Sequence, residues 1–156
     1  MMITIRPAKP EGVIAIGEIH MRAITVTSSG HYPREVVEAW ATPRDPSFYL
    51  HSITNKEFYV ATDKETIVGF GSFNPESREV EGLFVAPGFG GRGIGRKLLS
   101  KLEQRAQSLK INSVYLKASL NAVSFYERAG YTRREESRHR LQSGAEIPCV
   151  IMDKEL

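Results

Sequence analysis

The sequence predicts an α/β protein of the α+β type, with a mixed, mostly antiparallel sheet of about seven strands flanked by about four helices. Three β-like runs follow one another between residues 57 and 87, joined only by the short turns TDKE and NPES. Such short connections favour an antiparallel meander. Segments with helical periodicity stand on both sides of it. The 156 residues suit one domain, residues 1–156, with a single sizeable core.

The segment before the meander predicts one strand and two helices. MITIRPA alternates apolar and polar residues until Pro7 and Pro10 interrupt it, as expected for a strand that ends in a turn. EGVIAIGEIHMRAI places apolar residues at helical spacing from residue 13 to 23. PREVVEAWA predicts a second, shorter helix with Pro33 at its start.

The segment after the meander predicts two helices and three strands. Residues 94–109 form an amphipathic pattern that indicates a long helix, and NSVYLKA predicts a strand. NAVSFYERAG predicts a short helix with Asn121 as its N-cap and Gly130 just past its end. YTRREESRHR and EIPCVIMDKEL predict two final strands, joined around Ser143 and Gly144.

The composition is that of an ordinary globular protein, with 41% hydrophobic and 25% charged residues. It lacks a run of about 18 apolar residues, so neither a transmembrane helix nor a membrane partner is expected. MMITIRPAKP has no apolar signal core, and Cys149 is the only cysteine, which excludes an internal disulfide. We therefore expect a cytoplasmic protein.

The net charge of +3 fits either a nucleic acid or an anionic small ligand as partner. The basic residues are scattered, and their densest group, RREESRHR at 133–140, is interleaved with glutamates. This pattern favours a solvated basic surface. A nucleic-acid role is therefore not expected, although a steep salt dependence of DNA binding would reveal one.

The stretch GFGGRGIGRKLL (88–99) holds five glycines in its first eight residues, directly before the long helix. A strand, a glycine turn and a helix N-terminus together make an anion site, because unpaired N–H groups and the helix dipole face the ligand. The stretch lacks the Gly-Lys-Ser/Thr of a Walker motif. It also follows an antiparallel run, whereas a dinucleotide fold places its glycines after the first strand of a parallel sheet.

VEGLFVAPGFGGRGIGRKLL, followed by NAVSFYERAGY, resembles the GNAT superfamily of N-acetyltransferases. The family hallmark is a Q/R-x-x-G-x-G/A turn that binds the pyrophosphate of acetyl-CoA, and a later helix typically reads N-x-x-A-x-x-F-Y-x-x-x-G-F/Y. The resemblance covers the strand order of the whole chain and is most specific from residue 79 to 131. Gly90 stands where the family usually has Gln or Arg. The diphosphate contacts are mostly to backbone, so the resemblance implies that binding survives, with Arg92 or Arg96 supplying charge.

The resemblance implies acetyl-CoA as co-substrate and no metal. The fourth and fifth strands would splay apart, and the pantetheine arm would pair with the backbone between them. Backbone N–H near Val85 would stabilise the oxyanion of the tetrahedral intermediate. The implied cofactor-binding residues are Leu83, Phe84, Val85, Gly90, Gly91, Arg92, Gly93, Ile94, Gly95, Arg96, Asn121, Ser124 and Tyr126.

Three residues are candidates for the chemistry. An amine similar to that of lysine has a pKa near 10.4, so about one molecule in a thousand is neutral at pH 7 and a base is needed. Glu79 and Glu81 lie two apart on one strand, hence on one face, and either one is a candidate base; a solvated strand face is the alternative. Tyr126 matches the family tyrosine that protonates the thiolate of CoA. A buried tyrosine hydroxyl is expected to have a polar partner, and the alternative for Tyr126 is a purely structural core tyrosine.

The acceptor site is expected among the first two helices and the loop SSGHYPREVVEAW, where His31, Tyr32 and Trp40 are candidate lining residues. Structural roles remain the alternative for each of them. The other histidines, His20, His51 and His139, show no metal-ligand spacing. Cys149 is expected in the core, because no paired base suggests a covalent cysteine mechanism.

The resemblance, together with these candidate residues, implies an acetyl-CoA-dependent N-acetyltransferase that moves the acetyl group to a primary amine by direct transfer in a ternary complex. The alternative is a catalytically silent acyl-CoA-binding or regulatory domain on the same fold. The sequence leaves the acceptor open among a protein N-terminus, a lysine, a polyamine, an antibiotic and a small metabolite. The resemblance also allows a homodimer.

Overall fold

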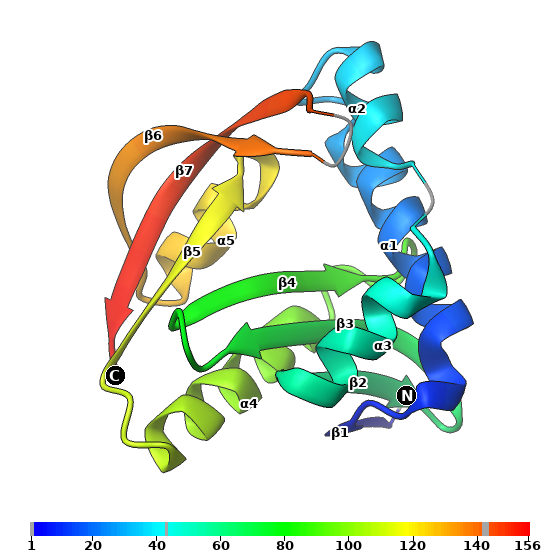
Figure 1. Cartoon of the computed structure of the whole chain (residues 1–156), viewed down its shortest axis with the longest axis vertical. Helices are drawn as coiled ribbons and strands as arrows, with labels where there is room; N and C mark the ends of the chain where they lie inside the picture. Colours follow the sequence, from blue (N-terminus) through cyan, green and yellow to red (C-terminus); the bar gives the residue numbers. More distant parts are fainter. Residues whose placement is uncertain (1, 43, 142–143) are drawn as a thin grey trace.

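A computed structural model describes residues 2–42, 44–141 and 144–156 of the chain. It contains one seven-stranded mixed sheet in the order β1-β2-β3-β4-β5-β7-β6 (Figure 1). The strand bounds are β1 (Ile3–Pro7), β2 (Glu57–Asp63), β3 (Thr66–Asn74), β4 (Glu79–Val85), β5 (Ser113–Ser119), β6 (Thr132–Arg140) and β7 (Glu146–Glu155). The predicted α/β class, the sheet and the antiparallel β2–β3–β4 meander are confirmed.

Five α-helices occur in the described residues, one more than predicted. Their bounds are α1 (Val13–Ser28), α2 (Arg34–Trp40), α3 (Pro46–Asn55), α4 (Ile94–Ser108) and α5 (Val123–Arg128). Two short 3-10 turns, η1 (Pro10–Gly12) and η2 (Leu120–Ala122), precede α1 and α5. Within the described part of the chain, no helix combines the length and the apolar character needed to cross a membrane.

The helix that the sequence prediction missed is α3. It has clear start signals, because the Asp45 side chain accepts a hydrogen bond from the Ser47 backbone N–H at 2.8 Å and Pro46 occupies the first turn. Only Tyr49 and Ser52 of this helix are buried, so its apolar stripe is too narrow to give a strong helical period. The start signals alone could have identified it.

The N-cap predicted for the short helix is wrong. The 3-10 turn η2 comes first, and Ala122 is the N-cap of α5, without a side-chain hydrogen bond. The Asn121 Oδ1 instead accepts a hydrogen bond from the Ser28 hydroxyl at 3.5 Å. Gly130 follows α5 with φ +98°, which confirms its predicted place past the helix end. Of the residues expected to join the last two strands, Gly144 has φ +89°, and Ser143 lies outside the described residues.

The central strands are covered on both faces, as their nearly continuous apolar sequences require. Phe58 and Val60 of β2 pack with α1 and α3, whereas the alternate residues Tyr59 and Ala61 pack with α4. Figure 1 shows α1 and α3 on one side of β2–β4 and α4 on the other. Every central strand therefore has a fixed register, because a slip by one residue would exchange the two apolar sets.

The sheet splits between β4 and β5. These parallel strands pair only at Glu79↔Tyr115 and Val80↔Leu116 in the described residues. Beyond this point β4 stays paired with β3 and β5 with β7, and the two halves diverge in Figure 1. A β-bulge lies beside the split, since Ser72 faces Gly82 while its neighbour Phe73 faces Val80.

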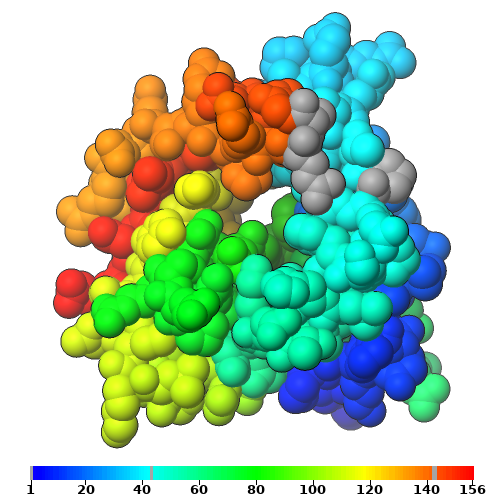
Figure 2. All heavy atoms as spheres, viewed as in Figure 1, coloured from blue at the N-terminus to red at the C-terminus, as the bar shows by residue number. Residues whose placement is uncertain are grey.

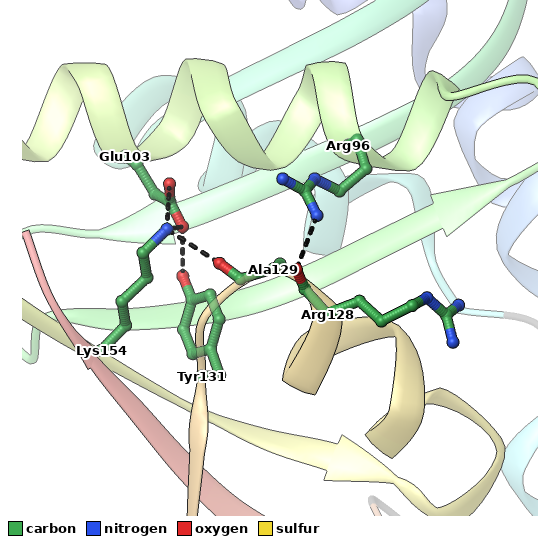
Figure 3. A network of polar contacts seen from close by, with 6 residues as sticks. All are labelled: Arg96, Glu103, Arg128, Ala129, Tyr131 and Lys154. Atoms are coloured by element: carbon green, nitrogen blue, oxygen red, sulfur yellow. Dashed lines mark hydrogen bonds and ion pairs between the residues drawn. The ribbon is translucent and has the colours of Figure 1, made fainter.

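A polar network fastens α5 to α4 (Figure 3). The Glu103 carboxylate accepts hydrogen bonds from the Tyr131 hydroxyl at 2.8 Å and from the Lys154 ammonium at 3.0 and 3.2 Å. Lys154 also donates to the Ala129 carbonyl at 2.9 Å, and Arg96 donates to the Arg128 carbonyl at 3.1 Å. Two cations thus satisfy carbonyls at the C-terminal end of α5 and bind it to the helix that follows the glycine turn.

Substituting Glu103→Leu should lower the free energy of unfolding by about 1–3 kcal/mol, measured by urea denaturation. The Tyr131 hydroxyl and the Lys154 ammonium would lose charge-assisted hydrogen bonds in a mostly buried setting, where the Glu103 side chain is only 15% exposed. Glu38→Ala removes the exposed Arg34–Glu38 pair on α2 and should cost much less. Equal losses in the two variants would contradict a stabilising role for the network.

Candidate active site

A cavity of about 310 Å³ occupies the split between β4 and β5. Its walls come from β4 and β5, from α1–α3 on one side and from β6 and β7 on the other. Figure 2 shows the opening between the α2–α3 region and the β6–β7 hairpin. We call it the central cavity. Its lining combines aromatic rings with a small number of charged groups, the usual character of a small-molecule site.

The glycine turn forms a second hollow of about 390 Å³, lined by residues of the turn with Arg96, Phe125 and Arg128. Gly93 is the N-cap of α4, and its φ of +79° is a conformation that residues with a side chain rarely adopt. No acidic residue stands in the first turn of α4, and no side chain caps it. The N–H groups at this helix end are therefore available to an anion.

One glycine of the motif has a packing role instead. A Cβ added to Gly95 would come within 3.2 Å of the Phe125 ring, so a glycine here permits the close approach of α5 to α4. At Gly90, which replaces the family's usual Gln or Arg, an added Cβ would meet nothing within 4 Å. Arg92, the basic residue of the turn, lies over the Phe89 ring at 5.4 Å.

The two hollows adjoin along two elements. On β4, Leu83 and Phe84 line the central cavity, and Val85 lines the glycine-turn hollow. On α5, Tyr126 lines the central cavity, and Phe125 lines the glycine-turn hollow. The predicted residues of β4, Tyr126 and the predicted residues of the turn other than Arg92 are therefore brought together, whereas Arg92 is not among the residues that line either hollow.

Of the other predicted cofactor residues, Ile94 lines a hollow and Asn121 and Ser124 do not. Ile94 lines the glycine-turn hollow, and its side chain is almost fully buried under the sheet. Asn121 lies in η2, and Ser124 is exposed on α5. Neither Asn121 nor Ser124 is among the residues that line the two hollows.

Both candidate bases line the central cavity, although the bulge at Glu81 interrupts regular alternation on β4. Glu79 is half-buried and accepts a hydrogen bond from the Tyr115 hydroxyl at 3.2 Å. Burial raises the pKa of Glu79 above its ordinary value, and the nearby charge of Lys117 acts against this rise. Glu81 forms an ion pair with the Lys56 ammonium at 2.6 Å. The two carboxylates therefore have different surroundings.

Tyr126 is buried, with its ring edge-to-face against Phe125 and Tyr131. Within the described residues, its hydroxyl makes no hydrogen bond, contrary to the polar partner that burial led us to expect. Burial raises the pKa of Tyr126, so the hydroxyl stays protonated at neutral pH. The ring is anchored by the core, and the residue faces the cavity.

The three candidate acceptor residues have different places. Trp40 lines the central cavity, whereas His31 is exposed in the turn after α1 and does not. The Tyr32 hydroxyl donates to the Pro148 carbonyl and accepts from the Leu120 backbone N–H, both at 2.8 Å. Tyr32 thus ties the α1–α2 turn to the β5 and β7 side of the split.

Three residues of the cavity wall that the sequence did not indicate as site residues are His20, Arg44 and Tyr49. The Tyr49 hydroxyl lies 2.8 Å from the His20 Nδ1, and an Arg44 guanidinium nitrogen lies 3.4 Å from the same atom. Arg44 can only donate, so the His20 Nδ1 is the acceptor and the ring is neutral. Burial, reinforced by the Arg44 charge, lowers the pKa of His20 to about 3. The helix signals of α3 could have pointed to Tyr49, but nothing local pointed to Arg44.

Three further residues line the central cavity, namely Lys117, His139 and Cys149. Cys149 is buried as expected, and burial raises the pKa of its thiol. Among the described residues, no three His, Cys, Asp or Glu side chains are grouped so that they could hold a metal ion.

Residues 28–156 match the family described as acetyltransferase (GNAT) domain. The chain belongs to the GNAT acetyltransferase family. Its relative YafP, an uncharacterized N-acetyltransferase of Escherichia coli K12, is 29% identical over 136 residues, which are 87% of this chain and 85% of YafP. The predicted GNAT membership and the acyltransferase class are thereby confirmed.

Solved structures share this GNAT fold over its full length. A GCN5-related N-acetyltransferase from Rhodopseudomonas palustris has a TM-score of 0.91 and 26% identity, covering 100% of this chain and 99% of that one. The PaiA N-acetyltransferase of Thermoplasma acidophilum, solved with coenzyme A, has a TM-score of 0.80 and 23% identity, with 100% of both chains covered. The second likeness supports the fold alone.

Proposed function

We propose that this GNAT protein binds acetyl-CoA and transfers the acetyl group directly to a primary amine in a ternary complex. The observation that carries the proposal is the junction of the two hollows. Consecutive residues of β4 and of α5 lead from an anion-binding turn into a cavity that holds carboxylates and the Tyr126 side chain. A ligand with a diphosphate at one end and a reactive thioester at the other fits this order.

The residues present suit coenzyme A. The turn offers N–H groups and open space, since a Cβ at Gly88, Gly90, Gly91 or Gly93 would meet nothing within 4 Å. Arg96 lines the hollow and would add positive charge near the diphosphate. The edge of β4 that faces β5 has no strand partner from Leu83 to Val85 in the described residues, so its backbone could pair with the amides of the pantetheine arm. Bound acetyl-CoA supplies an acetyl group activated as a thioester.

For the base we propose Glu79 rather than Glu81. Burial raises the pKa of Glu79, which makes its carboxylate a better proton acceptor than an exposed one. Glu81 is already engaged by Lys56. Glu79 takes a proton from the acceptor ammonium, directly or through water, and the neutral amine then attacks the thioester carbon. The nitrogen of the tetrahedral intermediate loses its extra proton to water, and the carbon–sulfur bond breaks to release the amide and the CoA thiolate.

Tyr126 is the proposed hydrogen-bond donor to the departing thiolate. A thiolate similar to that of cysteine has a pKa near 8.5, well below that of a buried tyrosine, so complete proton transfer is unfavourable. A charge-assisted hydrogen bond needs no such transfer and strengthens as the carbon–sulfur bond breaks. Backbone N–H groups near Val85 are the proposed donors to the thioester oxygen.

The competing function is a domain that binds acyl-CoA without catalysis. Both functions would use the glycine turn to bind the cofactor. Only the transferase would also need Glu79 and Tyr126 for chemistry. Turnover with a panel of amines, read by mass spectrometry, separates them. A protein that binds acetyl-CoA and acetylates no amine would be the silent domain.

Acetyl-CoA should raise the melting temperature. A ligand that binds only the folded state stabilises it by about 2.7 kcal/mol at a hundred times its dissociation constant. Gly93→Val should abolish the shift, because a β-branched residue is strained at φ +79° and would block the approach of phosphate. Gly30→Val, at an open turn without positive φ, is the matched control and should retain it. An unchanged melt of the wild-type protein in millimolar acetyl-CoA would overturn the cofactor assignment.

Glu79→Gln should lower turnover about 10²–10⁴-fold while sparing the affinity for acetyl-CoA. The wild-type activity should be lost as the pH falls through a pKa above the ordinary value of 4.5, because the base must be ionised. The deficit of the variant should shrink at high pH, where the amine is already neutral. Glu81→Gln should have the smaller effect, and Glu76→Gln, in the exposed β3–β4 turn, should have none. Full activity of Glu79→Gln across pH would place the base elsewhere.

Tyr126→Phe keeps the ring packing and removes only the hydroxyl. Turnover should fall about ten- to several-hundredfold, with little change in acetyl-CoA affinity or melting temperature. Tyr59→Phe is the matched control, because Tyr59 is a buried tyrosine on the α4 side of β2. Wild-type turnover in Tyr126→Phe would remove this hydroxyl from the mechanism, and loss of folding would instead support the core-tyrosine alternative.

A further inference from the structure

Arg44 brings a cation to the wall of the central cavity, and among the described residues it has no carboxylate partner. It lies in the α2–α3 connection, is half-buried and lines the cavity. Its guanidinium stands 5.2 Å over the Phe48 ring, which restricts the directions the fork can take. Among the described residues, no Asp or Glu lies within 4.0 Å of it.

The polar neighbours of Arg44 do not neutralise its charge. The His20 ring accepts a long contact of 3.4 Å at Nδ1 and is uncharged, and the Tyr49 hydroxyl shares that nitrogen at 2.8 Å. A guanidinium has five N–H donors in a planar fork suited to a bidentate carboxylate. Among the described residues, His20 and the Tyr49 hydroxyl are the hydrogen-bonding neighbours of the guanidinium, so most of its donors remain available to a ligand in the cavity.

The balance of charge in the cavity is positive. The charges of Lys56 and Glu81 cancel in their ion pair. The remaining charges of the lining are one negative charge, on Glu79, and two positive charges, on Arg44 and Lys117. Like Arg44, Lys117 has no carboxylate within 4.0 Å among the described residues, and its charge acts on Glu79. A half-buried cation gains most from an anion that enters with the ligand.

We propose that the acceptor is a small amine that also carries an anionic group, which Arg44 binds while the amine lies toward Glu79. This inference rests on the proposed acetyl transfer and narrows its substrate class. The cavity volume of about 310 Å³ suits a small molecule. The positive balance disfavours polyamines, whose second ammonium would meet Arg44 or Lys117. A carboxylate is the expected anion, because its two oxygens match the two N–H groups of the guanidinium fork. A phosphonate is the alternative anion, and the test below includes an amine that carries one.

The test compares four amines of similar length: γ-aminobutyrate, butylamine, putrescine and aminopropylphosphonate. Wild-type kcat/KM for γ-aminobutyrate should exceed that for butylamine by about ten- to a hundredfold, mainly through KM, and putrescine should be the poorest. Arg44→Met should abolish this preference, and Arg44→Lys, which keeps the charge but not the fork, should retain part of it. Arg34→Met, on the exposed surface of α2, should leave the ratio unchanged.

A second readout does not depend on turnover. With CoA saturating, γ-aminobutyrate should raise the melting temperature of the wild-type protein, more than butylamine does, and should fail to do so in Arg44→Met. Acetylation of butylamine and γ-aminobutyrate at equal efficiency would overturn the anion inference and leave the transferase proposal intact. Arg44-dependent stabilisation by γ-aminobutyrate without any acetylation would support the anion site and overturn the transferase proposal. A stronger response to the phosphonate than to the carboxylate would overturn the carboxylate assignment.

Discussion

The early separation of β4 from β5 is the constraint on which the rest of the site depends. The strands pair at only two positions, and each then continues with a different antiparallel partner. Because both halves of the sheet keep a ladder of their own, the split leaves unpaired backbone only on the edges that face each other. Those edges border the central cavity, and the Tyr32 hydroxyl links the helical side of the molecule to the β7 side at 2.8 Å. The split is thus held open by hydrogen bonds on both of its sides.

The glycine turn is fixed in relation to this split through α4 and α5. Gly95 lets the Phe125 ring approach the first turn of α4, and the Glu103–Lys154–Tyr131 network holds the other end of α5. The residue next to Phe125 is Tyr126, which faces the cavity. The distance between the glycine turn and the Tyr126 hydroxyl is therefore set by helix packing, which is more rigid than a loop.

Burial determines the electrostatic character of the cavity. His20 is kept neutral by desolvation beside Arg44, Tyr126 is kept protonated, and the Glu79 carboxyl becomes a stronger proton acceptor than an exposed glutamate. Among the described carboxylates that line the cavity, Glu81 has its charge balanced by an ion pair with Lys56, and Glu79 has no such pair. In the proposed mechanism, the desolvation that raises the pKa of Glu79 prepares it for proton transfer, and the partial burial of Arg44 favours the proposed anionic group of the acceptor.

The sequence by itself determined the elements whose patterns are local. The alternation and turns of residues 57–85 indicated the meander, and the five glycines before α4 indicated an anion turn. The meander and the positive φ of the glycine turn are found in the structure, because periodicity and positive φ depend on near neighbours, whereas anion binding at the turn stays a prediction. The narrow apolar stripe of α3 hid a helix with clear start signals, and the 3-10 turn η2 displaced the expected cap at Asn121.

Only the tertiary structure decided which side chains share the cavity. It brings Arg44 of the α2–α3 connection, Glu79 of β4 and Tyr126 of α5 to one space, and it leaves His31 outside. The tertiary structure also gives the two glutamates different partners from distant segments of the chain. Glu79 contacts Tyr115, and Glu81 contacts Lys56. Residue types and their spacing along the chain do not predict such long-range contacts. Burial and charge pairing arise only when the two halves of the sheet and the helices α1–α3 are packed around the split.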